Sequence, residues 1–157
     1  MPIEKLKKFL DENQVKYVRI SHSMAFTAPE IAKMAHIPGK ELAKTVMVII
    51  DGQMSMLVLP ASYKVDFDLL KDAFAAKEVE LATELEFKEL FPDCKIGGMP
   101  PFGNLYNLDV YVAQSLAEDE RFAFNAGSHT ELIQMEYKDF ERIVKPTVLK
   151  FSVKIDS

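Results

Sequence analysis

The amino-acid sequence predicts a mixed α/β fold, and three observations support this prediction. Stretches with helical periodicity are interspersed with short apolar stretches that are typical of strands. Two of these apolar stretches are joined by the dipeptide Asp51-Gly52, which favours a tight β-hairpin. The chain has 157 residues, of which 48% are hydrophobic, so it is long enough to bury a substantial core. We therefore expect a single domain over residues 1–157.

The first part of the chain predicts a helix, a strand and a second helix. Apolar residues at positions 3, 6, 9 and 10 fall on one helical face, which predicts an amphipathic helix over residues 3–13. Residues 15–21 have the composition of a strand. The stretch TAPE, residues 27–30, has the capping-box pattern with a proline in the first turn, and it predicts a short helix up to about residue 36.

The hairpin is the strongest local signal in the sequence. Residues 44–50 and 53–60 are two apolar runs with a turn dipeptide between them. Residues 46–50 are continuously apolar, which predicts a central strand that is covered on both faces.

The rest of the chain predicts two more helices among strands and then a last helix. Asp66 is expected to begin a helix that runs to about Phe74, and Thr83 begins a second capping box before a helix that ends near Phe91. Strands are expected at residues 77–81, 108–114, 121–127 and 130–137, and the last helix at residues 137–144, before a proline.

Composition restricts the cellular environment and the partners. Cys94 is the only cysteine, so no internal disulfide can form and no oxidising compartment is required. The charged N-terminus lacks the apolar core of a signal peptide, and no segment approaches the length of a membrane span. We therefore expect a cytoplasmic protein without a membrane partner. The formal net charge of −5 argues against a broad nucleic-acid surface, although it permits a partner that is contacted at only a few phosphates.

The motifs of common catalytic sites are absent. The sequence contains no G-x-S-x-G, no Walker loop and no GxGxxG after a strand. The three histidines and Cys94 do not have the spacing of metal ligands, so we expect no metal and no other cofactor. Because no histidine stands near Cys94 in the sequence, an inert thiol is expected there.

Two features favour a binding site instead. Residues 97–103, GGMPPFG, combine glycines, which let a ligand approach the backbone N–H groups, with prolines, which hold the loop in one shape. This composition suits the preformed rim of a pocket, and the simpler alternative is a connection between a helix and a strand. Lys44 stands at the entrance of the buried strand, where its ammonium is either solvated or placed at a pocket rim to meet a phosphate or an ester carbonyl.

Two further stretches are rich in polar groups. Residues 125–130, NAGSHT, offer two hydroxyls, an amide and an imidazole, although small polar residues after a strand also form ordinary turns. Residues 21–28, which include His22, are explained by a strand end and a helix cap.

Taken together and in order, these segments resemble the YbaK family, the relatives of the editing domain that is inserted in bacterial prolyl-tRNA synthetases. The resemblance covers about residues 3–145 and is carried by FTAPEIAKMAHIP, ELAKTVMV, LPASYKVDFDLLK, GGMPPFG and FNAGSHTELIQM. It implies a mixed, partly closed β-sheet with surrounding helices. It also implies a metal-independent hydrolase that cleaves the ester between a wrongly attached amino acid and its tRNA.

The resemblance also implies which residues form the site. Lys44 matches the nearly invariant lysine of the family, and Gly97 and Pro101 match its G-x-x-x-P loop, so these three are the implied catalytic residues. The implied substrate-binding residues are Gly98, Met99, Phe102, Gly103, Asn125, Gly127, Ser128 and His129. His129 falls where some members that remove alanine carry histidine and others carry arginine.

Two positions depart from the patterns of particular branches. Thr45 stands where several alanine-specific members have asparagine, and Leu132 stands where the cysteine-removing branch has an acidic residue. The amino acid that is removed therefore does not follow from the sequence.

The mechanism that the resemblance implies uses a ribose hydroxyl of the substrate to position a water, so no protein general base is required. The sequence is thus interpreted as a free-standing trans-editing aminoacyl-tRNA deacylase. Its partners are the acceptor end of a mischarged tRNA and, as a further candidate, an aminoacyl-tRNA synthetase. The alternatives are a non-catalytic module that binds a tRNA end or a small metabolite, and a regulatory domain that docks on a synthetase.

Met99 and Phe102 raise a question of specificity. Both lie in the loop that is best placed to form a wall against large aminoacyl groups, and the ring of Phe102 is the stiffer of the two. The alternative is that Phe102 only anchors the loop in the core.

Overall fold

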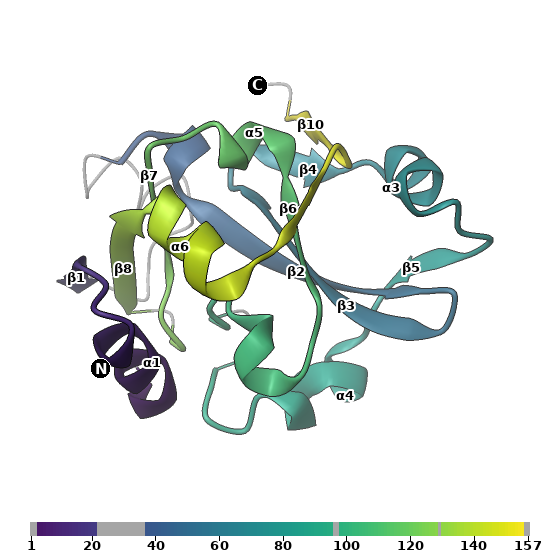
Figure 1. Cartoon of the computed structure of the whole chain (residues 1–157). Helices are drawn as coiled ribbons and strands as arrows, with labels where there is room; N and C mark the ends of the chain where they lie inside the picture. The colour runs from purple at the N-terminus through teal and green to yellow at the C-terminus, as the bar shows by residue number, and fades with distance from the viewer. Residues whose placement is uncertain (1–2, 22–36, 96–97, 129, 156–157) are drawn as a thin grey trace.

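A five-stranded mixed sheet lies at the centre of the molecule (Figure 1). The computed structural model describes residues 3–21, 37–95, 98–128 and 130–155. The strands follow the order β5-β2-β3-β6-β9, with bounds β2 (Ala43–Ile50), β3 (Gln53–Pro60), β5 (Val79–Leu81), β6 (Val110–Ala113) and β9 (Thr147–Leu149). β2 pairs antiparallel with β3 and β5, whereas β6 is parallel to β3 and β9 is parallel to β6. The prediction of a mixed sheet is confirmed.

A second sheet is antiparallel and has three strands in the order β1-β8-β7. Its strands are β1 (Tyr17–Ser21), β7 (Arg121–Asn125) and β8 (Glu131–Glu136), and a separate pair joins β4 (Tyr63–Val65) to β10 (Ser152–Lys154). A parallel bridge between Leu42 and Ala123 connects the start of β2 to β7. This bridge continues the five-stranded sheet into the second one, which gives the partly closed arrangement.

Helices lie around these sheets (Figure 1). The α-helices are α1 (Glu4–Glu12), α3 (Phe67–Phe74), α4 (Glu84–Phe87), α5 (Gln114–Ala117) and α6 (Tyr137–Val144), and 3-10 turns cover Gly39–Glu41, Lys88–Leu90 and Gly103–Tyr106. In the described part of the chain, no helix is both long and apolar enough to cross a membrane.

Local signals explain where most elements begin. Asp66 caps α3, because its side chain accepts hydrogen bonds from the backbone N–H groups of Asp68 and Leu69, each at 3.0 Å. Thr83 and Glu86 form the expected capping box, although α4 ends at Phe87 and continues as a 3-10 turn. The helix expected over residues 27–36 lies outside the described residues.

The hairpin turn has the conformation that its sequence predicts. Asp51 and Gly52 both have positive φ angles, 47° and 84°, as a two-residue turn of the mirror-image type requires. The side chain of Asp51 also accepts hydrogen bonds from the N–H groups of Lys77 (3.0 Å) and Glu78 (2.9 Å), which ties β5 to the hairpin.

Apolar clusters cover both faces of β2, as its continuous apolar run predicts. Met47 faces the first cluster, which also contains the buried rings of Phe102, Phe122, Phe124 and Phe140. Val48 faces the second cluster, under α3. A third, smaller cluster lies where the two sheets meet and consists of Ile37, Leu42, Ala123 and Leu132, with Ile20 and Ala61 packed against it.

Candidate functional site

The start of β2 presents two polar side chains to opposite faces of the sheet. Lys44 pairs with Leu59 of the second cluster, whereas Thr45 pairs with Val58 of the first cluster, and successive side chains of a strand alternate between faces. Lys44 is half-buried, and burial lowers the pKa of its ammonium. In the described part of the chain, Lys44 has no hydrogen-bond or ion-pair partner. A desolvated ammonium without a partner is available to a ligand.

Asn125 lies on the same face as Lys44. Leu42 and Ala123 form a parallel bridge, and Lys44 and Asn125 each follow their bridge residue by two positions. Because every second side chain of a strand points to the same face, both side chains lie on one face. Asn125 also pairs with Leu132, a member of the third cluster, which confirms the face. The Oδ1 atom of Asn125 is buried and accepts no hydrogen bond from any described residue. A buried acceptor without a donor carries a desolvation cost that a ligand donor can relieve.

Lys44 and Asn125 therefore form a donor and an acceptor on one face, beside the apolar third cluster. The ammonium can bind a carbonyl oxygen or a phosphate, and the amide oxygen can accept from an ammonium or a hydroxyl. This set of groups suits a small ligand that carries both an acceptor and a donor.

The two loops that the sequence singled out are joined to one another. The N–H of Gly127 donates to the carbonyl oxygen of Gly98 at 2.8 Å, and the N–H of Lys95 donates to the carbonyl oxygen of Gly127 at 2.9 Å. Glycine is required at both contact points. Gly127 has a φ of 100°, and a Cβ on Gly98 would lie 2.9 Å from the backbone of Ser128.

The glycine-proline loop is packed into the protein. All residues from 98 to 103 are buried, Pro101 among them, and the hydroxyl of Thr45 donates to the carbonyl oxygen of Met99 at 3.3 Å. The N–H of Gly98 donates to the carbonyl oxygen of Lys95 at 2.9 Å, so this N–H is already engaged. The expectation of an open rim with free backbone donors is therefore wrong for Gly98.

Phe102 and Gly103 are part of the packed core. The Phe102 side chain has no exposed surface, and its ring packs against Phe9, Phe124 and Phe140 with centroid distances of 6.1, 5.3 and 5.3 Å. A Cβ on Gly103 would lie 2.9 Å from Val110. Because a fully buried ring offers no surface to a substrate, the placement favours the alternative in which Phe102 anchors the loop.

Comparison with known protein families identifies the chain. The model of the aminoacyl-tRNA editing domain matches residues 22–143, which span the start of β2, the glycine-proline loop and the polar turn. The chain belongs to the aminoacyl-tRNA editing domain family. The resemblance to YbaK-type editing domains is thereby confirmed.

Individual relatives are distant. A proline–tRNA ligase of Leuconostoc citreum (strain KM20) is 27% identical over 100 residues, which is 64% of this chain and 17% of the ligase. The editing domain thus spans less than a fifth of the length of this curated relative.

Solved structures share the fold over almost the whole editing domain. Hypothetical protein APE2540 has a TM-score of 0.83 at 20% identity, over 96% of this chain and 100% of that one. A protein described as a candidate trans-editing enzyme for prolyl tRNA synthetase has a TM-score of 0.80 at 18% identity, over 97% and 96% of the two chains. These similarities establish the α/β fold with its mixed sheet.

The remaining polar residues of the turn lie close to the joined loops. The Oγ atoms of Ser128 and Thr130 are 3.3 Å apart, and the N–H of Thr130 donates to the Ser128 hydroxyl at 3.4 Å. Two predicted site residues, Gly97 and His129, lie outside the described residues, and so does His22.

Burial suppresses the reactivity of Cys94. Burial raises the pKa of the thiol to about 11, and the Sγ atom lies 3.4 Å from the Tyr106 hydroxyl, which in turn donates to Asp93 Oδ1 at 3.0 Å. Among the described residues of the editing domain, no group of three or more His, Cys, Asp or Glu side chains is placed to hold a metal ion.

Sequence reasoning passed over one buried carboxylate. Glu131 at the start of β8 is only 8% exposed, and one of its oxygens accepts from the Ser21 hydroxyl at 3.2 Å. The sequence feature that could have indicated this burial is the position of Glu131 directly before the apolar residues of a buried strand.

Proposed function

We propose that this editing domain is an aminoacyl-tRNA deacylase that acts in trans on the ester between a wrongly attached amino acid and the terminal adenosine of tRNA. The observation that carries the proposal is a pair of groups on one face that have no partner among the described residues, the Lys44 ammonium and the Asn125 amide oxygen. Membership of the editing family supplies the class of reaction.

Lys44 stabilises negative charge at the reacting ester. Hydrolysis converts the ester carbonyl into a tetrahedral intermediate whose oxygen is negative, and a fixed positive charge nearby lowers the barrier. The half-burial of Lys44 strengthens this interaction, because less water screens the ammonium. Lys44 accordingly acts as an electrostatic catalyst at the carbonyl oxygen.

Asn125 orients the substrate. Its Oδ1 atom only accepts hydrogen bonds, and the aminoacyl end offers two kinds of donor, the α-ammonium and a ribose hydroxyl. A hydrogen bond to either donor places the ester next to Lys44. The gain in rate then comes from orientation, which removes conformational freedom before the reaction.

The attacking water needs no side-chain base in this proposal. The water oxygen bonds to the ester carbonyl carbon, and the bond from that carbon to the ribose oxygen breaks. The water proton reaches the departing ribose oxygen through the neighbouring ribose hydroxyl, and the products are a free amino acid and tRNA. Cys94, with its raised pKa, is excluded as a nucleophile in this scheme.

Action in trans is supported by the solved relatives. One of them, at 18% identity, is described as a candidate trans-editing enzyme for prolyl tRNA synthetase. A tRNA for proline is therefore the first tRNA to test, and a prolyl-tRNA synthetase is the first protein partner.

The test is single-turnover hydrolysis of a panel of tRNAs that carry alanine, serine, cysteine or proline. The proposal expects release of at least one wrongly attached amino acid at a rate well above that of spontaneous hydrolysis, with less effect on prolyl-tRNA. If no ester is cleaved faster than in buffer, the deacylase is refuted. Binding of the same tRNAs without hydrolysis would then identify a binding module.

A further inference from the structure

A cavity of about 350 Å³ lies between the N-terminus of α1 and the joined loops. Ile3, Asp93, Lys95, Gly127 and Ser128 contribute to its walls. Gly127 and Ser128 also belong to the polar turn that follows Asn125, so the cavity lies against this turn. Its volume is near the lower end of the range of about 300–1,000 Å³ that is usual for small-ligand pockets.

Lys95 brings a positive charge to this cavity and is held in place by the turn. Its side chain is exposed, and its backbone N–H donates to the carbonyl oxygen of Gly127 at 2.9 Å. No ion pair to Lys95 is found in the described part of the chain. The ammonium is therefore available to an anion that reaches the turn.

Lys5 of α1 is a second cation near this cavity, although its side chain does not line it. Its Nζ atom lies 4.6 Å from the centre of the Tyr106 ring, a cation–π contact that orders the side chain. The Tyr106 hydroxyl donates to Asp93, which lines the cavity, so this contact fixes Lys5 near the same wall.

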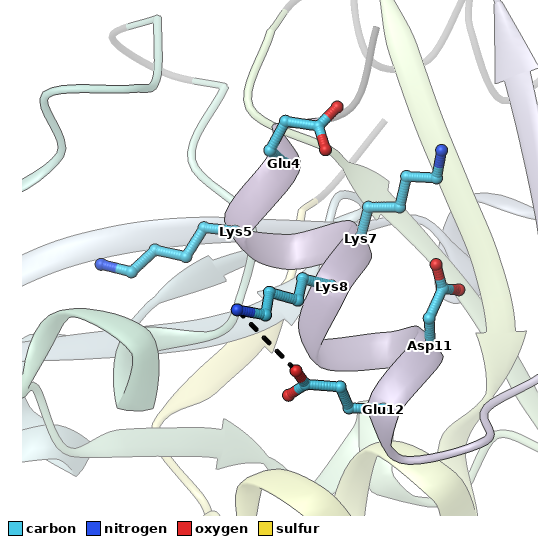
Figure 2. Close-up of a pocket in the computed structure, with 6 residues that line it drawn as sticks. All are labelled: Glu4, Lys5, Lys7, Lys8, Asp11 and Glu12. Atoms are coloured by element: carbon cyan, nitrogen blue, oxygen red, sulfur yellow. Dashed lines mark ion pairs between the residues drawn. The ribbon is translucent and has the colours of Figure 1, made fainter.

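Figure 2 shows a separate pocket on α1, lined by Glu4, Lys5, Lys7, Lys8, Asp11 and Glu12, and how the helix distributes its charges. Lys5 and Lys8 extend from one side of the helix, whereas Lys7 and Asp11 extend from the other. Lys8 pairs with Glu12 at 3.9 Å, which offsets its charge, but Lys5 has no such acidic partner in the described chain. Lys5 is the cation of α1 that remains for an external anion on this side.

Asp93 is the acidic residue of the cavity wall, and its position limits its repulsion of an anion. Its Oδ1 atom accepts from the Tyr106 hydroxyl at 3.0 Å and lies 3.6 Å from Cys94 Sγ. These contacts turn the carboxylate oxygen towards its protein partners.

We propose that this cavity binds the phosphodiester backbone of the tRNA acceptor strand next to the terminal adenosine, through Lys5 and Lys95. The inference rests on the proposed function, because it names how the same substrate is held. A protein with a net charge of −5 repels a polyanion overall, so binding depends on local lysines near the site. A cavity that is lined by the polar turn and by Lys95, with Lys5 held near its wall by Tyr106, meets this need.

Direct binding tests the inference without relying on catalysis. Anisotropy of a fluorescein-labelled, uncharged tRNA minihelix is measured from 50 to 300 mM salt with the wild type, Lys5→Gln and Lys95→Gln. Each variant should bind several-fold more weakly at low salt, and the slope of log K against log salt should become shallower by about 0.7–0.9. Lys71→Gln is the matched control, because Lys71 belongs to α3, which lies at the other end of the molecule in Figure 1.

A second experiment measures catalysis and distinguishes binding of the acceptor strand from effects on the ester site. The KM for alanyl-tRNA should rise in both variants with kcat unchanged, and Lys95→Arg should restore it. The alanyl ester of adenosine, which carries no phosphate, should be hydrolysed equally by all proteins.

Three results would overturn the inference. One is an unchanged salt slope in Lys5→Gln and Lys95→Gln, and another is an equal change in Lys71→Gln. The third is displacement of the labelled minihelix by inorganic phosphate at concentrations as low as those of unlabelled minihelix. That result would identify a site for a free anion. If no protein hydrolyses any ester, the proposed function fails, whereas the anisotropy still decides whether the lysines hold the acceptor strand.

Discussion

The N–H of Gly127 donates a 2.8 Å hydrogen bond to the carbonyl oxygen of Gly98, and this bond joins two loops that are far apart in the sequence. Gly127 has a φ of 100°, which disfavours any residue with a Cβ, and a Cβ there would overlap the Cγ2 atom of Ile3. Ile3 precedes α1, so the turn, the loop and the first helix all depend on this one glycine.

Gly127→Ala should therefore destabilise the protein and impair deacylation. We expect a loss of roughly 1–3 kcal/mol in the free energy of unfolding from backbone strain, with a further loss from the overlap with Ile3. Gly52→Ala is the matched control, because Gly52 also has a positive φ but has open space around its Cα. Urea unfolding compares the two variants. Equal losses would show that the contact with Ile3 contributes nothing.

Lys44→Ala should abolish deacylation and leave the fold intact. The ammonium is half-buried and has no partner among the residues that the structure describes, so its removal should change the free energy of unfolding by less than about 0.5 kcal/mol. Loss of one electrostatic group at a developing oxyanion costs about 100- to 1,000-fold in kcat. Lys64→Ala, at an exposed position of β4, serves as the control for single-turnover rates and thermal melting. A wild-type rate, or a collapsed melting temperature, would remove Lys44 from the catalytic role.

Phe102→Ala should destabilise the protein and reduce activity on every ester to a similar degree. Its ring is fully buried among Phe9, Phe124 and Phe140, and truncation of such a ring costs about 3–5 kcal/mol. For a domain of this size that loss lowers the melting temperature by about 6–20 °C. Rates on alanyl-, seryl- and a bulky aminoacyl-tRNA decide the issue. A selective gain on the bulky ester would instead restore the interpretation of Phe102 as a pocket wall.

Activity should be insensitive to EDTA and to the modification of Cys94. With a pKa of about 11, the thiol is almost fully protonated at neutral pH, so iodoacetamide should react slowly with it. The described residues contain no group suited to a metal ion. Mass spectrometry of the alkylated protein, alongside the rate of deacylation, provides the measurement. An activity that is lost to chelation and restored by zinc would contradict the mechanism.

Asp119 should make stability depend on pH in the mildly acidic range. Burial raises the pKa of its carboxyl to about 6, with contributions from Glu41 and Glu118, whereas Lys40 acts in the opposite direction. The native state therefore keeps a proton that the unfolded state has lost between about pH 4 and pH 6. Stability should fall as pH rises through this window, and the loss should persist above it.

Asp119→Asn removes this titration and supplies the test. The variant should gain stability relative to the wild type between pH 4 and pH 6, and the difference should then stay constant up to pH 8. Urea unfolding at unit steps of pH measures it. If the difference in free energy of unfolding between the variant and the wild type does not change between pH 4 and pH 7, the pKa of Asp119 is the same in the native and unfolded states.

Local chemistry in the sequence was sufficient to place many elements. Asp51-Gly52 sets the hairpin because both residues tolerate positive φ, and the side chains of Asp66 and Thr83 cap the helices that follow them. The last helix runs over Tyr137–Val144, as expected from its periodicity and the proline after it. β4 and β10 escaped prediction because three positions are too few to show a period, although β5, which also has three residues, lies within the strand expected at residues 77–81.

The tertiary structure alone decided what the candidate site is made of. The sequence singled out Lys44 and Asn125 separately, but only the bridge of Leu42 with Ala123 turns both side chains to one face. Likewise, the loop of residues 98–103 has the composition of a pocket rim, yet its residues are buried because Phe102 completes a cluster of rings from distant helices and strands. Capping and turn preferences act between residues a few positions apart, whereas strand pairing and core packing join residues across the chain, so the first can be read locally and the second cannot.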